Sequence, residues 1–229
     1  MKTIGLLGGM SWESTELYYR LINQGIKARL GGLHSARIAL VSVDFQEIEE
    51  LQRTGDWEQS GAALAQTARQ VQAAGADFLL LCTNTMHKVA PQIEAAIDIP
   101  FLHLADATAQ RIRAEGLQTV GLLGTAFTME QDFYRGRLAH HGLEVLVPPE
   151  ADRRIVHRVI YEELVLGEVN PASRAEYLRI IDDLAARGAQ GVIEGCTEIG
   201  MLVQQEHTDT PLFDTTAIHA QAAVERALA

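Results

Sequence analysis

The chain has two thiols that could take part in chemistry, and Cys196 is the stronger candidate because of its position in the sequence. Cys82 and Cys196 are the only cysteines of the chain, and they form no Cys-x-x-Cys pair, which argues against a disulfide framework. Cys196 follows the apolar run 191–194. A positioned thiol whose pKa lies near the working pH can take and return the proton of a carbon acid. The alternative for each cysteine is a small, buried hydrophobic residue.

An internal repeat gives Cys196 a counterpart. Three segments recur in the same order, namely 3–8 as 119–124, 75–81 as 188–194, and 98–100 as 209–211. The offset between residues 75 and 188 pairs Thr83 with Cys196. We therefore expect two copies of one α/β unit, related by a pseudo-twofold axis.

Short apolar runs alternate with amphipathic stretches, as in parallel sheets covered by helices. The predicted strands are Thr3–Leu7, Arg37–Val43, Asp77–Leu81, Phe101–Leu104, Thr119–Leu123, Glu144–Val147, Gly191–Glu194 and Leu212–Phe213. Apolar spacing predicts a helix over Arg154–Leu166, and Thr128–Gln131 fits a capping box that opens another. Gly32, Gly142 and Gly188 stand where helices should end.

Thr83 and Cys196 both follow predicted strands, where open α/β sheets bind their ligands. Across a pseudo-twofold cleft, they would reach one carbon from its two faces. Inverting a stereocentre needs this arrangement, because one group removes the Cα proton and another returns a proton to the opposite face. A helix N-terminus after Cys196 would lower the thiol pKa, and backbone N–H groups after both residues would bind a carboxylate. Strand alternation predicts that Cys82 faces the core.

Other residues give weaker signals. The glycine-rich segment 5–9 follows the first strand, but it does not fit the Gly-x-Gly-x-x-Gly pattern of a nucleotide site. Met10 and Ser11 are expected at the cleft rim, with Ser11 capping the next helix. The eight histidines show no ligand spacing, so no metal site is predicted.

Two interpretations remain open for His87, and two for the neighbours Gln52 and Arg53. His87 either orients a group in the cleft or is a structural histidine whose ring nitrogens are satisfied. Gln52 and Arg53, after the second strand, either reach a substrate carboxylate or form a solvated helix end.

Composition narrows the class of protein. The 229 residues carry a formal net charge of −11, which disfavours nucleic acid and anionic membranes as partners. No apolar run approaches the roughly 20 residues of a membrane span, and the glycine-rich start with early glutamates is unlike a signal peptide. We therefore expect a cytoplasmic protein.

Four segments together carry a family resemblance: 8–15 (Gly-Gly-Met-Ser-Trp-Glu-Ser-Thr), 82–87 (Cys-Thr-Asn-Thr-Met-His), 195–198 (Gly-Cys-Thr-Glu) and 213–215 (Phe-Asp-Thr). With them the chain resembles the cofactor-independent aspartate/glutamate racemase family along its whole length, especially the broad-specificity racemases of enteric bacteria. The resemblance implies two Rossmann-like lobes, residues 1–103 plus 212–229 and residues 104–211, with the active site in the cleft between them. It also implies that no pyridoxal phosphate or other cofactor is used.

The resemblance further implies site residues. The paired catalytic positions fall on Thr83 and Cys196, and the substrate-binding positions are Met10, Gln52, Asn84, Thr85, Thr125, Leu166 and Thr197. Thr83 replaces the usual first cysteine. A hydroxyl is a poor acid or base near neutral pH, so the two directions of reaction should differ in rate. Val165 stands where many relatives acting on acidic substrates have a lysine, which favours a neutral polar substrate such as homoserine.

The sequence thus predicts an amino-acid racemase acting on a small polar or acidic amino acid, with a homodimer as one assembly that it allows. Two alternatives remain open. One is a one-thiol decarboxylase or isomerase of the same superfamily, in which a single cysteine protonates one face of an enediolate. The other is a two-lobed module that binds an amino acid without catalysis.

Overall fold

The computed structural model describes all 229 residues, which fall into two compact units. The first consists of Met1–Leu104 with His219–Ala229, and the second is Ala105–Ile218. The predicted division placed residues 212–229 in the first lobe, whereas the strand Leu212–Asp214 pairs within the sheet of the second unit. The chain returns to the first unit at His219.

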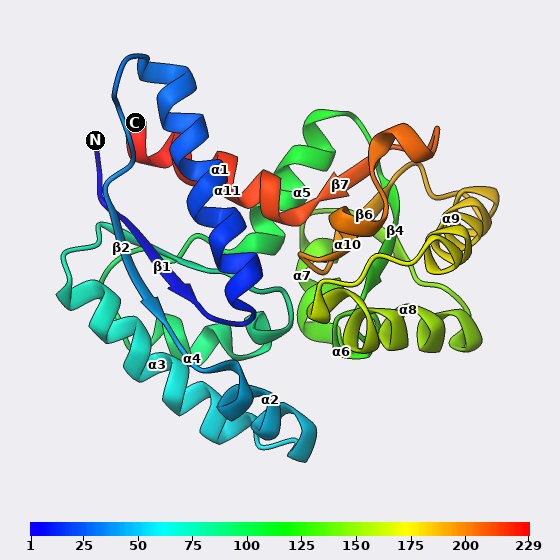
Figure 1. The fold of residues 1–229 in the computed structure, drawn as a ribbon, viewed down its shortest axis with the longest axis horizontal. Helices are drawn as coiled ribbons and strands as arrows, with labels where there is room; N and C mark the ends of the chain where they lie inside the picture. The colour runs from blue at the N-terminus through cyan, green and yellow to red at the C-terminus, as the bar shows by residue number, and fades with distance from the viewer. The chain divides into compact units, whose positions relative to one another are not determined.

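The first unit contains a three-stranded parallel sheet of order β2-β1-β3 (Figure 1). Its strands are β1 (Ile4–Gly8), β2 (Ile38–Ser42) and β3 (Phe78–Leu81). Its helices are α1 (Trp12–Leu30), α2 (Phe45–Thr54), α3 (Trp57–Ala73), the 3₁₀ helix η1 (Thr85–Val89), α4 (Ala90–Glu94) and most of α11 (Thr215–Leu228).

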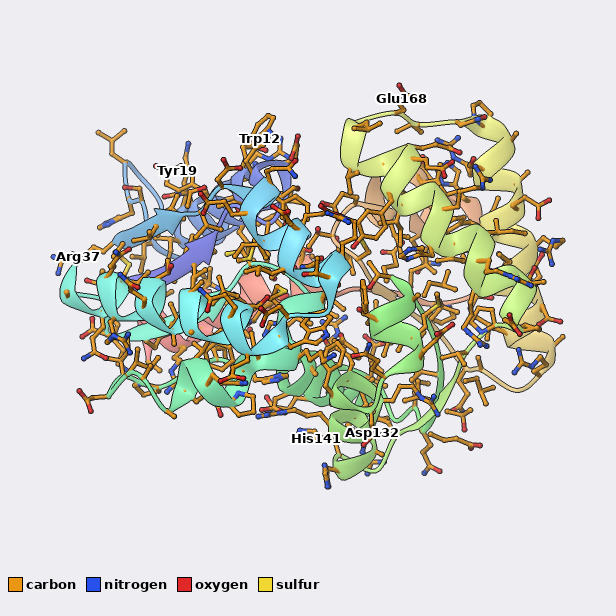
Figure 2. The ribbon with its side chains drawn as sticks, turned by 90° about the horizontal axis from the view of Figure 1, so that it is seen from below. Trp12, Tyr19, Arg37, Asp132, His141 and Glu168 are labelled. Carbon is orange, nitrogen blue, oxygen red and sulfur yellow. The ribbon has the colours of Figure 1, made fainter.

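Strand alternation separates the two faces of this sheet. Leu6 and Leu80 belong to an apolar cluster with residues of α1 and α11, whereas Leu7 and Leu81 pack with residues of α3. In Figure 1, α1 and α3 accordingly lie on opposite sides of β1 and β2. Trp12, the first residue of α1, has an exposed fraction of 67% and is labelled in Figure 2.

The second unit contains a four-stranded parallel sheet of order β5-β4-β6-β7. Its strands are β4 (Thr119–Gly124), β5 (Glu144–Leu146), β6 (Val192–Gly195) and β7 (Leu212–Asp214). Its helices are α5 (Leu104–Ala114), α6 (Ala126–Glu130), α7 (Asp132–His140), α8 (Glu150–Glu162), η2 (Leu164–Leu166), α9 (Pro171–Ala186), α10 (Ile199–Leu202) and η3 (Gln205–His207). Leu123 and Val192 of the sheet pack with apolar residues of α8 and α9.

The two sheets share one connectivity, as the sequence repeat predicts. The order β2-β1-β3 corresponds to β5-β4-β6. The counterpart of β7 in the first unit is a single parallel bridge between Leu79 and Phe101. Phe101, which forms this bridge, follows the repeated segment 98–100, and β7 follows its counterpart 209–211. The α/β class with two parallel sheets covered by helices is confirmed.

One predicted strand does not form, and one predicted helix has other bounds. Residues Phe101–Leu104 do not form a strand, because Leu104 already opens α5. The helix predicted over Arg154–Leu166 begins earlier, at Glu150, and ends at Glu162; Glu163 adopts φ −127° and ψ −64°, and a 3₁₀ turn follows.

The helix ends follow local chemistry. The predicted cap is confirmed at Ser11, whose Oγ accepts a hydrogen bond from the N–H of Ser14 at 3.2 Å. The capping box predicted at Thr128 is wrong, because Thr125 caps this helix and Thr128 lies inside it. Gly142 and Gly188, with φ values of 76° and 104°, follow α7 and α9 as predicted. No helix in the structure combines the length and apolar character needed to span a membrane.

Candidate active site

Cys196 comes directly after β6, at the carboxyl end of the second sheet. Its side chain is buried, with 9% of its surface exposed. The Sγ atom donates a hydrogen bond to Oε2 of Glu198 at 3.0 Å, and the hydroxyl of Thr197 donates to the same oxygen at 2.6 Å. Glu198 is itself buried. The thiol therefore lies beside a carboxylate that can accept its proton.

The electrostatics of Cys196 differ from the expectation. Burial, followed by the charge and the hydrogen bond of Glu198, raises the pKa of the Cys196 thiol well above its ordinary value. Backbone N–H groups of Thr197 and Glu198 act in the opposite direction but do not outweigh these effects. The predicted lowering by a helix N-terminus is wrong. The following helix, α10, is only four residues long and begins at Ile199, and a carboxylate stands nearer to the sulfur.

Thr125 lies beside Cys196 along the edge of the second sheet. Gly124 and Gly195 are register partners on β4 and β6, so Thr125 and Cys196 follow paired positions. Neither glycine tolerates a side chain here: a Cβ at Gly124 would lie 2.9 Å from the carbonyl oxygen of Gly195. Thr125 is buried and caps α6 by accepting a hydrogen bond from the N–H of Thr128 at 3.4 Å. In the second unit, Thr125, Cys196 and Thr197 thus follow the carboxyl ends of the neighbouring inner strands β4 and β6.

Thr83 has the equivalent place in the first sheet, two residues beyond the carboxyl end of β3. It is 7% exposed, and Cys82 before it is fully buried in the cluster that includes Tyr18 of α1. Burial raises the pKa of the Cys82 thiol far above its ordinary value. The interpretation of Cys82 as buried packing is confirmed.

His87 fixes the backbone at Thr83. Its Nδ1 donates to the carbonyl oxygen of Thr83 at 2.7 Å, and its Nε2 accepts from the backbone N–H of Leu104 at 3.2 Å. Because Leu104 can only donate, the proton of the neutral ring is assigned to Nδ1. The interpretation of His87 as a histidine whose ring nitrogens are satisfied is confirmed, and one of its two backbone partners belongs to Thr83.

The other predicted residues of the first unit gather around η1. Asn84 and Thr85 open η1 and are buried. Gln52 of α2 is also buried, at 5% exposure, and its Nε2 lies 2.9 Å from Sδ of Met86. Met10 packs in the same apolar cluster as Met86. Gln52 is therefore no solvated helix end, whereas Arg53 is exposed and lies 3.9 Å from Glu50.

Leu166 stands apart from the other predicted residues of the second unit. Its side chain is 68% exposed on η2. The preceding Val165 is partly buried and packs against the cluster that contains Cys196 and Ile199. This segment thus packs against the apolar cluster that includes Cys196 through Val165, not through Leu166.

Sequence reasoning missed two functional candidates. Glu198 was visible only as part of the Gly-Cys-Thr-Glu motif, although a carboxylate two residues from a thiol is itself a signal. His157 of α8 accepts a hydrogen bond from the N–H of Ala126 at 3.1 Å and so satisfies the start of α6 next to Thr125. Burial lowers the pKa of His157, which keeps the ring neutral as an acceptor. Nothing in the sequence spacing marks this residue.

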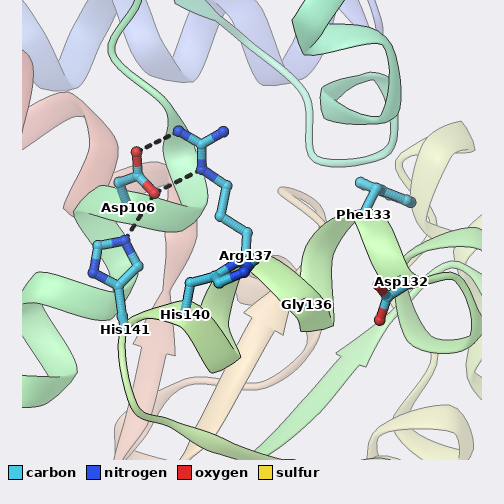
Figure 3. A pocket seen from close by; sticks show the side chains of 7 residues that line it. All are labelled: Asp106, Asp132, Phe133, Gly136, Arg137, His140 and His141. Atoms are coloured by element: carbon cyan, nitrogen blue, oxygen red, sulfur yellow. Dashed lines mark hydrogen bonds and ion pairs between the residues drawn. The ribbon is translucent and has the colours of Figure 1, made fainter.

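A separate cavity of about 550 Å³ lies against α5 and α7 and contains an ion cluster (Figure 3). Arg137 makes two hydrogen bonds of 2.7 Å to the carboxylate of Asp106, and His141 lies 2.9 Å from the same group. Burial raises the pKa of Asp106, but the bonds from Arg137 and His141 outweigh it and hold the pKa below its usual value. The charges in this cluster compensate one another, which gives it a structural role in joining the two helices.

Comparisons with known proteins show which family this chain resembles. The family model described as Asp/Glu/Hydantoin racemase matches residues 7–223. A crystal structure of a Yersinia pestis protein assigned as an Asp/Glu racemase is 57% identical, with a TM-score of 0.94 and full coverage of both chains. An aspartate racemase homologue from Pyrococcus horikoshii is 31% identical with a TM-score of 0.88, again over 100% of each chain. The broad-specificity amino-acid racemase RacX of Bacillus subtilis is 24% identical over 76% of this chain and 75% of its own.

Proposed function

Since the chain belongs to the Asp/Glu/hydantoin racemase family, we propose that it racemises a free amino acid without a cofactor, with Cys196 as its catalytic thiol. One observation carries the proposal. Cys196 directly follows β6, an inner strand of the second sheet, its raised pKa keeps the thiol protonated, and its Sγ donates to Oε2 of Glu198 at 3.0 Å. A buried thiol serving only as packing would not need this partner.

The Cys196–Glu198 pair supplies both protonation states that racemisation requires. In one direction the S–H group gives its proton to the planar carbanion at Cα. In the other direction the S–H proton first passes to Oε2 of Glu198, and the resulting thiolate removes the Cα proton. The backbone N–H groups of Thr197 and Glu198 stabilise the sulfur anion while it exists. In this proposal the Cys196 sulfur acts as a base only after Glu198 has accepted its proton.

Thr83 takes the opposite face of the same Cα in this proposal. When Cys196 removes the Cα proton, the Thr83 hydroxyl protonates the opposite face of the carbanion, a water molecule returns a proton to the Thr83 oxygen, and the hydroxide ion so formed takes the extra proton from Glu198. In the reverse direction Glu198 takes a proton from that water, and the hydroxide ion deprotonates Thr83, whose oxygen then removes the Cα proton. After the Cys196 S–H group has protonated the carbanion, Glu198 returns its proton to the thiolate. His87 supports the step by holding the Thr83 carbonyl at 2.7 Å, which fixes the backbone from which the hydroxyl projects. Because a hydroxyl is a far weaker acid than a thiol, protonation from the Thr83 side is the slower direction.

Substrate contacts are assigned to buried residues near the carboxyl ends of the strands in the two sheets. We propose Met10, Gln52, Asn84, Thr85, Thr125 and Thr197 for this role. Leu166 is exposed, so we assign it the outer wall of the side-chain pocket. The neutral Val165 supplies no cation for a second carboxylate, and we therefore propose a neutral polar substrate such as homoserine.

The test is a screen of single enantiomers of the proteinogenic amino acids and homoserine for loss of optical activity. Wild type is expected to racemise at least one of them, and Cys196→Ser to lose nearly all turnover. Cys82→Ser, which changes the other buried thiol, is the matched control and should keep activity. Full activity of Cys196→Ser would refute the proposal, and release of carbon dioxide in place of the enantiomer would identify a decarboxylase.

A further inference from the structure

Another polar cavity lies beside β6 and β7, and none of its lining residues is among those assigned to catalysis or substrate binding. It measures about 270 Å³ and is lined in part by two carboxylates, Glu194 and Asp214. These residues are register partners on the neighbouring strands, so their side chains leave the sheet on the same face. We call this space the carboxylate cavity.

Glu194 lacks the partner that a buried carboxylate requires. Only 4% of its surface is exposed, and its Oε1 atom is buried without a hydrogen bond. Burial, followed by the charge of Asp214, raises the pKa of Glu194 to about 8. Burial likewise raises the pKa of Asp214, although its Oδ1 accepts hydrogen bonds from the N–H groups of Thr216 and Ala217 at 2.8 and 3.1 Å. Unsatisfied buried polar atoms are rare in native proteins and call for an explanation.

The remaining walls show which ligand would satisfy both carboxylates. No cationic side chain lines the cavity. Gln204 and Gln205 contribute amide groups, while Val203 and Leu212 contribute apolar surface. Nowhere do three or more histidine, cysteine, aspartate or glutamate side chains come together as metal ligands. A cation with several N–H donors and a short alkyl group fits this combination of two acceptors and an apolar wall better than a bare metal ion.

We propose that the carboxylate cavity binds the ammonium group of a small primary amine between Glu194 and Asp214. The ammonium group donates one hydrogen bond to each carboxylate, and its alkyl group lies against Val203 and Leu212. Charge-assisted hydrogen bonds of this kind are the stronger ones in proteins. The net charge of −11 favours the approach of a cation.

The experiment is an NMR titration of the ¹⁵N-labelled full-length chain with methylammonium chloride near pH 8. We expect the amide signals of Gly200, Gln204 and Asp214 to shift along one saturable curve. Sodium chloride at equal ionic strength corrects for screening. Tetramethylammonium carries the same charge without N–H donors and should cause no saturable shift.

Three variants decide the assignment. Glu194→Gln removes the charge with little change in shape and should weaken methylammonium binding about tenfold or more, the effect of losing one hydrogen bond to a charged group. Glu206→Gln, at a neighbouring exposed glutamate, should bind as wild type does. Gly200→Ala keeps both carboxylates and places a methyl group 3.6 Å from Oδ2 of Asp214, so it should also weaken binding.

The proposal is overturned if wild type shows no saturable shift, or if Glu194→Gln binds methylammonium as tightly as wild type. It is also overturned if tetramethylammonium, sodium or magnesium ions produce the same saturable shifts. Should Glu194→Gln fail to fold, unchanged binding by Gly200→Ala contradicts the proposal by itself.

Discussion

The Cys196 sulfur and the Glu198 carboxylate form a donor–acceptor pair, with Sγ and Oε2 separated by 3.0 Å inside the second unit. Glu198 influences the Cys196 thiol in two opposing ways. Burial, and after it the negative charge of Glu198, holds the proton on the thiol and raises the pKa of Cys196. The same oxygen is the nearest base to which that proton can move when the sulfur must act as a base.

Glu198→Gln separates these two influences. We expect kcat for racemisation to fall by about 10²–10⁴-fold, the usual contribution of a positioned acid–base group. Alkylation of Cys196 by iodoacetamide should become faster, because loss of the carboxylate charge lowers the thiol pKa. Peptide mapping distinguishes Cys196 from the fully buried Cys82. Slower alkylation together with unchanged kcat would contradict the role given to Glu198.

Thr83→Cys tests the opposite face. A thiol is a much stronger acid than a hydroxyl, so this variant should racemise at least one enantiomer faster than wild type. Initial rates are to be measured separately from the L and the D substrate. Thr83→Ser keeps a hydroxyl and serves as the control. If Thr83→Cys accelerates neither direction, Thr83 does not lie on the proton path.

His87→Ala should affect activity and stability through the backbone at Thr83. It leaves the Thr83 carbonyl and the Leu104 N–H without their His87 partner, and each unsatisfied buried group costs about 1–3 kcal/mol of the free energy of unfolding. We expect a lower kcat with a smaller change in KM, because Thr83 and not the substrate is displaced. His87→Gln can still donate and accept, so it should recover part of kcat. An unchanged kcat in a destabilised His87→Ala would show that the residue is structural only.

Glu194 predicts a pH dependence of stability. Its pKa is raised to about 8 in the folded chain, so the folded state holds a proton that the unfolded state loses near the ordinary glutamate pKa. Stability therefore falls as the pH rises from about 4.5 through 8. Asp214 is the charged neighbour that contributes to this effect.

Glu194→Gln removes this dependence. In urea unfolding without added amines, the variant should be more stable than wild type at pH 8.5, and the difference should shrink toward pH 5. Glu206→Gln should follow the wild-type profile. Parallel profiles of wild type and Glu194→Gln would mean that the Glu194 carboxyl does not titrate in this range.

The elements of the fold were largely predictable, because apolar periodicity and the repeat reflect local and topological rules. Seven of the eight predicted strands form, and the repeat predicts the shared order of the two sheets. The exception, Phe101–Leu104, keeps one bridge to Leu79 before α5 begins. Its composition is that of a strand, but the chain leaves the sheet there to enter the second unit.

The positions of Thr83 and Cys196 after strand ends were predictable, whereas the electrostatics around Cys196 were not. Strand ends placed Thr83 and Cys196 at sheet edges, since strand direction is encoded locally. The raised pKa of Cys196 depends on burial and on where the Glu198 carboxylate points, and spacing encodes neither. Glu194 interrupts the apolar run of β6 in the sequence, but its missing hydrogen-bond partner is visible only once β7 and α10 surround it.

Hydrogen exchange at Cα tests the central role of Cys196 most directly. Proton NMR in deuterated buffer follows the Cα hydrogen of a substrate enantiomer found in the screen, while optical activity is recorded on the same sample. We predict that wild type replaces this hydrogen with deuterium as the substrate racemises, and that Cys196→Ser leaves it in place. Exchange by Cys196→Ser at the wild-type rate would contradict the account.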